Sequence, residues 1–132
     1  SAYPVTEPYR FPVQPGTPEW VELDEAGLAR NACRMPAGLA EQMTSQALLE
    51  TALDDPYVID LLAYSDPVQG FWSNVGYNDA LAELETRRDA AGVVEKEFEK
   101  LPPLDEITDV DTVTRWYILS AFSKGMESPP EV

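Results

Sequence analysis

The sequence predicts an all-α protein, a compact bundle of about six to seven short helices with an extended proline-rich N-terminal arm. Two observations lead to this fold class. Apolar residues recur at helical spacing between residues that favour helix starts, such as Thr17, Asp66 and Asp89. Beyond the arm, apolar–polar alternation is not sustained over more than four residues and no Asn-Gly or Asp-Gly pair marks a hairpin, so strands have little support.

The N-terminal arm is defined by its prolines. The first twenty residues hold Pro4, Pro8, Pro12, Pro15 and Pro18. Proline fixes φ and lacks an N–H, so this density imposes an extended backbone. Aromatic and β-branched residues such as Tyr9, Phe11 and Val13 lie between the prolines. We therefore expect residues 1–16 to be docked on a single all-α domain that spans residues 17–132.

The first helical signals follow the arm. Residues 17–19 read Thr-Pro-Glu, which supplies an N-cap, a proline at the first helical position and an acid in the first turn. Asp24 is expected to cap a short helix that reaches Arg30. Pro36 is expected to open another helix that reaches Met43.

Three helix starts are predicted in the middle of the chain. Thr44 or Ser45 caps a helix with an apolar stripe of leucines and alanines. Asp55 and Asp66 are each followed by proline, and each pair is expected to begin a helix. Between these pairs, residues 57–62 are apolar nearly all round, so we expect this segment to be buried in the middle of the bundle.

Two further helices are predicted after residue 76. Asn78 or Asp79 caps a helix with Leu81 and Leu84 on one face. Asp89 is expected to cap the clearest amphipathic stretch in the chain, which ends at a double proline.

The last helix is expected over residues 111–124, with Gly125 as its stop. Its centre, residues 116–119, is apolar on more than one side, so it either threads the core or leaves a face for a partner. An acidic cluster precedes it, made of Asp105, Glu106, Asp109 and Asp111. A calcium loop would need a glycine and a closing glutamate, so Asp105–Asp111 is interpreted as helix capping by Asp109 or Asp111, with cation binding as the alternative.

The composition excludes several classes of function. Twenty-four acidic and nine basic residues give a net charge of −15, which disfavours nucleic acid and anionic membrane surfaces as partners. No apolar run reaches the roughly 20 residues that span a bilayer, so we expect no membrane insertion. The chain has no histidine and a single cysteine, Cys33, which we expect to be a small buried apolar group. We therefore predict no catalytic residues, no metal site and no cofactor; the oligomeric state is not set by the sequence.

Residues 66–78 are chemically the most distinctive segment, because they combine amides, small residues and three aromatics. Such a surface can stack on a sugar ring or grip a peptide. The candidate ligand-binding residues are Gln69, Trp72, Asn74, Tyr77 and Asn78. The alternative interpretation is a joint between two helices, in which Gly70 and Gly76 allow backbones to approach closely.

A carboxylate-dependent hydrolase would need two acids across a cleft, one of them with a pKa raised by burial. Asp60 is the best single candidate, because it lies inside an apolar segment. The alternative is that this acid is hydrogen-bonded to a neighbouring helix end.

The order of landmarks over roughly residues 17–100 resembles a group of exported bacterial helical proteins of unknown function. The landmarks are Thr17, Pro18, Glu19, Trp20, Cys33, Pro36, Pro56, Asp60, Ala63, Tyr64, Gln69, Gly70, Phe71, Asn78, Leu81, Leu84, Arg88, Asp89 and Ala90. The resemblance implies no catalytic residues and implies export, to the cell surface or the medium. The chain opens Ser-Ala-Tyr-Pro, so we expect any signal segment to have been removed.

Together these observations predict a non-enzymatic interaction or structural module outside the cytoplasm, with another protein as its partner. Two alternatives are a carbohydrate or small-ligand binder that uses Trp72, Tyr77 and Asn78, and a hydrolase that uses Asp60.

Overall fold

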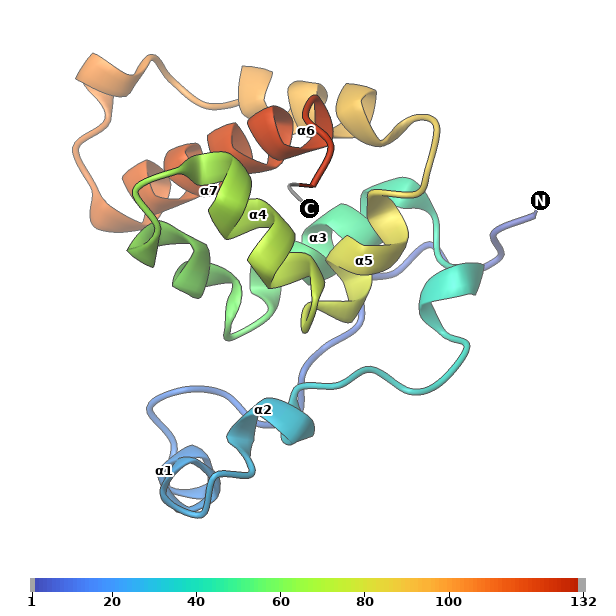
Figure 1. Ribbon diagram of the computed structural model, residues 1–132, viewed down its shortest axis with the longest axis vertical. Coiled ribbons are helices and arrows are strands. Elements are labelled where there is room, and N and C mark those ends of the chain that lie inside the picture. Colours follow the sequence, from blue (N-terminus) through green and yellow to red (C-terminus); the bar gives the residue numbers. More distant parts are fainter. Residues whose placement is uncertain (1, 131–132) are drawn as a thin grey trace.

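Helices make up the regular structure of residues 2–130, the part of the chain that the computed structural model describes (Figure 1). The α-helices are α1 (Pro18–Glu25), α2 (Ala29–Ala32), α3 (Ser45–Asp54), α4 (Pro67–Val75), α5 (Asp79–Leu84), α6 (Ala90–Glu99) and α7 (Val110–Met126). The 3-10 helices are η1 (Ala40–Gln42), η2 (Val58–Ala63) and η3 (Leu104–Glu106). No strand forms within residues 2–130, and the all-α prediction is confirmed.

Side-chain caps begin most of the longer helices where the sequence predicts them. Thr17, Thr44, Asp66, Asn78 and Asp109 each accept a hydrogen bond from a backbone N–H two or three residues ahead. These bonds satisfy donors that have no partner inside the helix. The capping interpretation of the acidic cluster is thereby confirmed at Asp109.

Several predicted helix boundaries are wrong. Asp24 lies inside α1, and the chain reverses at Gly27, whose φ is +74°, before α2 begins. Pro36 opens a turn, and only the short η1 follows it. Asp55 ends α3. The predicted boundary at Asp89 is correct, since α6 begins at Ala90, but the Asp89 side chain makes no capping hydrogen bond; its carboxylate accepts a hydrogen bond from the Ser45 hydroxyl at 2.6 Å.

The prediction that residues 57–62 are wholly buried is also wrong. The segment forms η2, whose Val58 and Leu61 are buried at 5% and 2% exposure, whereas Ile59 and Leu62 are 54% and 41% exposed. The direction of its contacts explains this: η2 packs mainly on α4 and α7, and this packing buries Val58 and Leu61 but leaves Ile59 and Leu62 exposed.

The core is centred where α4 crosses α7, with α3, α5 and α6 packed around them. Phe71 of α4 and Phe122 of α7 meet edge to face at 5.9 Å between ring centroids, and both are fully buried. Gly125 was predicted to stop the last helix, but α7 runs through it to Met126. Its role is packing, because a Cβ at this position would overlap the Phe71 ring.

The N-terminal segment lies against the bundle. Val5 bridges to Met43 as an isolated parallel pair, and the N–H of Tyr9 donates to Thr51 Oγ1 at 3.0 Å. Phe11 and Val13 are buried at 4% and 7% exposure.

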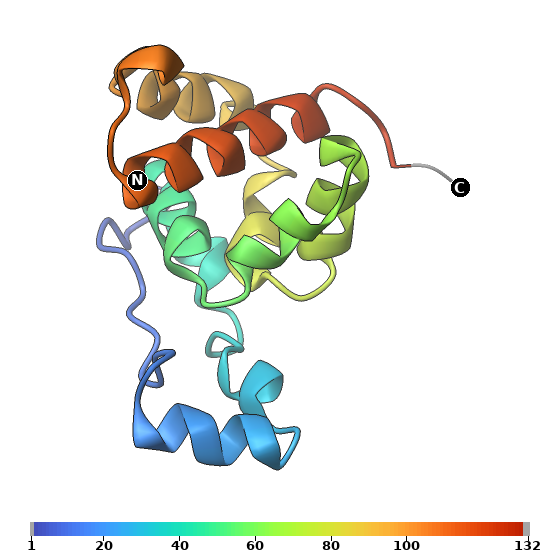
Figure 2. The same cartoon turned by 90° about the vertical axis from the view of Figure 1, so that its left-hand side faces the viewer.

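Helices α1 and α2 form a hairpin at one end of the molecule, away from the other helices (Figures 1 and 2). No residue of α1 is buried. The hairpin meets the bundle mainly through Ala29 of α2 and through Cys33, the residue after α2, and both are buried. We call residues 29–33 the base of the hairpin. Among residues 2–130, no helix has both the length and the apolar character needed to cross a membrane.

Two helical glycines give a matched test of the core. Gly125→Ala should destabilise the protein by about 1–3 kcal/mol, because the added methyl group forces Phe71 to move. Gly92→Ala in α6 should stabilise it by up to about 1 kcal/mol, since a Cβ there meets nothing and alanine favours the helix. Urea unfolding of both variants measures the difference, and equal effects of the same sign would contradict the packing described here.

Candidate functional site

The five candidate ligand residues lie in two places. Gln69 is exposed on α4 and Trp72 is half-buried against the core, and both line a surface cleft. Asn74 and Asn78 are fully buried at 0% exposure. Tyr77 lies beyond them, against Tyr57 and the base of the hairpin. The structure therefore does not bring the five together into one ligand cavity.

The first cleft runs along the outer side of α4 and has a volume of about 330 Å³. It is lined by Tyr64, Val68, Gln69, Trp72, Ser73 and Pro130. The Tyr64 hydroxyl and Ser73 Oγ are 2.8 Å apart. The Trp72 indole N–H donates to the carbonyl of Ser128 at 2.9 Å, so the polar edge of this ring is already occupied.

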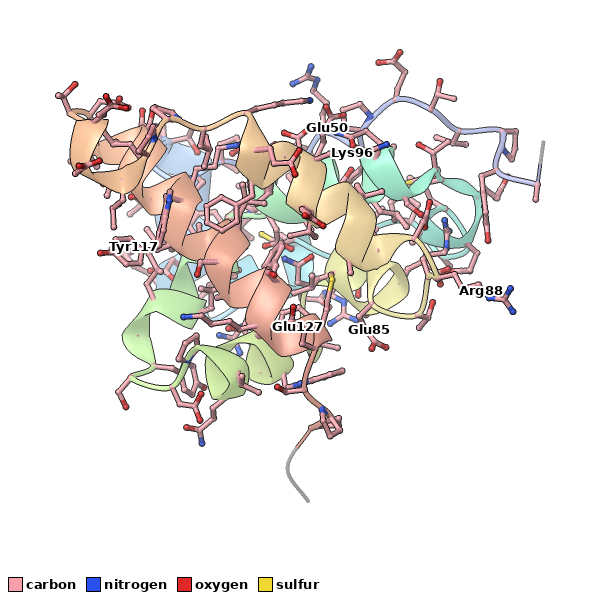
Figure 3. All side chains as sticks on the ribbon, turned by 90° about the horizontal axis from the view of Figure 1, so that it is seen from above. Glu50, Glu85, Arg88, Lys96, Tyr117 and Glu127 are labelled. Carbon is pink, nitrogen blue, oxygen red and sulfur yellow. The ribbon has the colours of Figure 1, made fainter. Side chains whose placement is uncertain are left out.

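A second cleft, of about 270 Å³, lies between η2 and α7. Its lining includes three exposed apolar side chains, Leu62, Tyr64 and Tyr117, with exposures of 41%, 38% and 49%. Figure 3 shows Tyr117 projecting outward from α7. Tyr64 lines both clefts. We call the two clefts together the Tyr64 surface.

The buried amides hold the ends of three helices in place. Asn78 Nδ2 donates to the Ala52 carbonyl in α3 and to Asn74 Oδ1, both at 3.1 Å, while Asn78 Oδ1 caps α5. Asn74 Nδ2 donates to the Tyr57 carbonyl at 3.0 Å. These amides therefore serve the joint between helices that the sequence offered as the alternative to a ligand site.

A cluster of aromatic and charged side chains lies next to this network. The Arg30 guanidinium carbon is 4.2 Å from the centroid of the Tyr77 ring and 5.0 Å from that of Tyr57. Asp60 is 3.5 Å from Arg30 Nη2, and the Tyr77 hydroxyl donates to it at 3.4 Å. The Asp60 side chain is 39% exposed, so it is not the buried acid that a hydrolase was expected to use.

Asp55, which the sequence predicts only as a helix cap, is the buried acid instead. It is 2% exposed; Oδ1 accepts the Tyr57 N–H at 2.8 Å, and Oδ2 has no hydrogen-bond partner among residues 2–130. Burial, together with the carboxylate of Asp79, raises the pKa of Asp55 to about 6, although the Tyr57 N–H and Arg34 oppose the shift. Its position directly after a buried helix face was the only signal in the sequence.

The surroundings of Asp55 also determine the protonation state of Cys33. Burial and the nearby Asp55 carboxylate raise the pKa of the Cys33 thiol to about 11, so the thiol stays protonated at neutral pH. Asp79, at the start of α5, pairs with Arg34 at 2.6 Å and accepts a hydrogen bond from the Met35 N–H at 2.9 Å, so it connects α5 to the segment that follows α2. Within residues 2–130, no group of three or more Asp, Glu or Cys side chains is arranged to hold a metal ion.

Compared with protein-family models, curated proteins and solved structures, the chain shows no match to any of them.

Asp55 makes stability depend on pH in a defined direction. Its pKa is higher in the folded state than the ordinary value of 3.8, so the folded state binds the proton more tightly. As the pH falls from 7.5 through about 6, Asp55 becomes protonated in the folded state, and the free energy of unfolding should therefore rise. Asp55→Asn should be more stable than wild type at pH 7.5, by at most about 3 kcal/mol, and this advantage should shrink steadily toward pH 4.

The control is Asp54→Asn, the same change at an exposed neighbour, which should leave the pH dependence unaltered. Denaturant unfolding from pH 4 to pH 7.5 provides the measurement. If Asp55→Asn and wild type differed by the same free energy of unfolding at every pH, the buried carboxylate would not be the source of the pH dependence.

Proposed function

We propose that the chain is a non-enzymatic interaction module that binds an apolar segment of another protein through the Tyr64 surface. The observation that carries this proposal is the exposure of Leu62, Tyr64 and Tyr117 along one cleft between η2 and α7. Exposed apolar side chains that gather on one face mark interaction sites, and aromatic residues supply most of the binding energy at such sites.

The volumes of the two clefts and the net charge of the chain indicate the kind of partner. The two clefts, of about 330 and 270 Å³, lie near the lower end of the size range of small-molecule pockets, and each is large enough for one or two apolar side chains. The net charge of −15 favours a partner segment whose apolar residues are flanked by Lys or Arg, because opposite charges speed association. Action outside the cytoplasm is supported by the resemblance of residues 17–100 to exported helical proteins.

Two alternatives are less well supported. A carbohydrate would need an open aromatic face with free polar groups beside it, whereas Trp72 packs edge to face on Phe71 and its N–H is bonded to Ser128. A hydrolase built on Asp60 would need a free carboxylate, whereas this side chain is paired with Arg30 and Tyr77.

A peptide library displayed on phage and selected on the immobilised chain tests the proposal. The selected peptides should combine aromatic or aliphatic residues with Lys or Arg. Their affinity should fall at least about tenfold on a Leu62→Ser/Tyr117→Ser variant, because each apolar anchor contributes more than about 1 kcal/mol. Raising the salt concentration should also weaken binding.

The matched control is Val110→Ser, an exposed apolar residue at the start of α7 outside both clefts, which should bind as wild type does. Equal binding to both variants would overturn the assignment to the Tyr64 surface. Glycan binding that is lost in Trp72→Ala would favour the carbohydrate alternative, and glycoside turnover that is lost in Asp60→Asn would favour the hydrolase.

A further inference from the structure

The cluster around Arg30 has the composition of a cation site. Tyr57 and Tyr77 meet edge to face with their ring centroids 6.3 Å apart, and Trp20 lies 5.5 Å from Tyr57. Asp60 places a carboxylate at the same point. Aromatic faces combined with a carboxylate attract a cation through the ring quadrupole and through its charge.

The main walls of this site belong to the bundle and do not depend on Arg30. Asn74 accepts the Tyr77 N–H through its carbonyl and donates to the Tyr57 carbonyl through its side chain. Asp55 accepts the Tyr57 N–H. Because Asn74 and Asp55 are buried, both tyrosines are anchored at their backbone before any cation enters.

Arg30, by contrast, is held weakly. Its side chain is 55% exposed, and it lies on the short α2 at the base of the hairpin. Cation–π contacts and ion pairs of exposed side chains are individually weak, because water competes for the charge. Rotation of this one side chain into solvent would therefore open the site without moving the hairpin.

We propose that Tyr57, Tyr77 and Asp60 form a binding site for a guanidinium group, which Arg30 fills in the free protein and which an arginine side chain of a protein partner takes over. The guanidinium fits because it is planar and stacks on a ring while it pairs with a carboxylate. The surrounding negative charge favours an arginine within a peptide over free arginine, whose own carboxylate would be repelled. This proposal is independent of the Tyr64 surface.

The test removes the Arg30 side chain, which occupies the site in the free protein. Arg30→Ala should bind N-acetyl-arginine amide, with shifts of the Tyr57 and Tyr77 ring signals in NMR spectra. Wild type should bind at least about threefold more weakly, because Arg30 competes for the same site from within the chain. The control is Arg88→Ala, which removes an exposed arginine outside this site and should bind as wild type does (Figure 3).

Three comparisons make the test specific. N-acetyl-citrulline amide, which has the same shape without the charge, should not bind. Free arginine should bind more weakly than the amide, and tighter binding of free arginine would overturn the assignment to a protein partner. Adding Tyr77→Leu to Arg30→Ala should abolish binding. Equal binding of citrulline and arginine amides, or ring signals that do not move in Arg30→Ala, would overturn the site itself.

Thermal unfolding shows whether Arg30→Ala is folded. If it is not, wild type is titrated to saturation with N-acetyl-arginine amide. The Tyr77 ring signals must then shift and the Arg30 side-chain signals must move toward those of a free arginine; the absence of either change would overturn the proposal.

Discussion

The pair of buried amides at Asn74 and Asn78 is the interaction on which the rest of the structure depends. One side chain joins the end of α3 to the start of α5, and the other joins the end of α4 to the segment that leads into η2. A buried amide that loses a partner costs about 1–3 kcal/mol, so the two side chains hold these four segments in one arrangement. The orientation of Tyr57 and Tyr77 follows from that arrangement.

Most helix starts could be predicted from the sequence because a cap is a local device. Thr17, Thr44, Asp66, Asn78 and Asp109 each act on a backbone group two or three residues away, so the pattern alone suffices. Asp55 and Asp89 show the limit of this reasoning. The carboxylate of Asp89 bonds to the distant Ser45 instead of to its own helix. Asp55 does accept the N–H of Tyr57 two residues ahead, but its burial at the end of α3 depends on packing.

Features that depend on distant contacts could not be predicted. Gly125 reads as a helix stop, and only the approach of Phe71 from α4 shows why a glycine is needed within α7. Residues 57–62 read as a buried helix, yet the neighbours available to η2 cover one side and leave Ile59 and Leu62 in solvent. The candidate site divided for the same reason, since Gln69 and Trp72 line a surface cleft, whereas Asn74 and Asn78 are buried and join helix ends.

The burial of Cys33 makes it a built-in reporter. A thiol at 2% exposure with a pKa near 11 reacts slowly with alkylating reagents and with other thiols. Since this sulfur lies at the base of the α1–α2 hairpin, its modification rate measures how often that base opens. With one cysteine in the chain, every labelling event reports on that single place, and the intact protein should resist linking into covalent pairs even in oxidising surroundings.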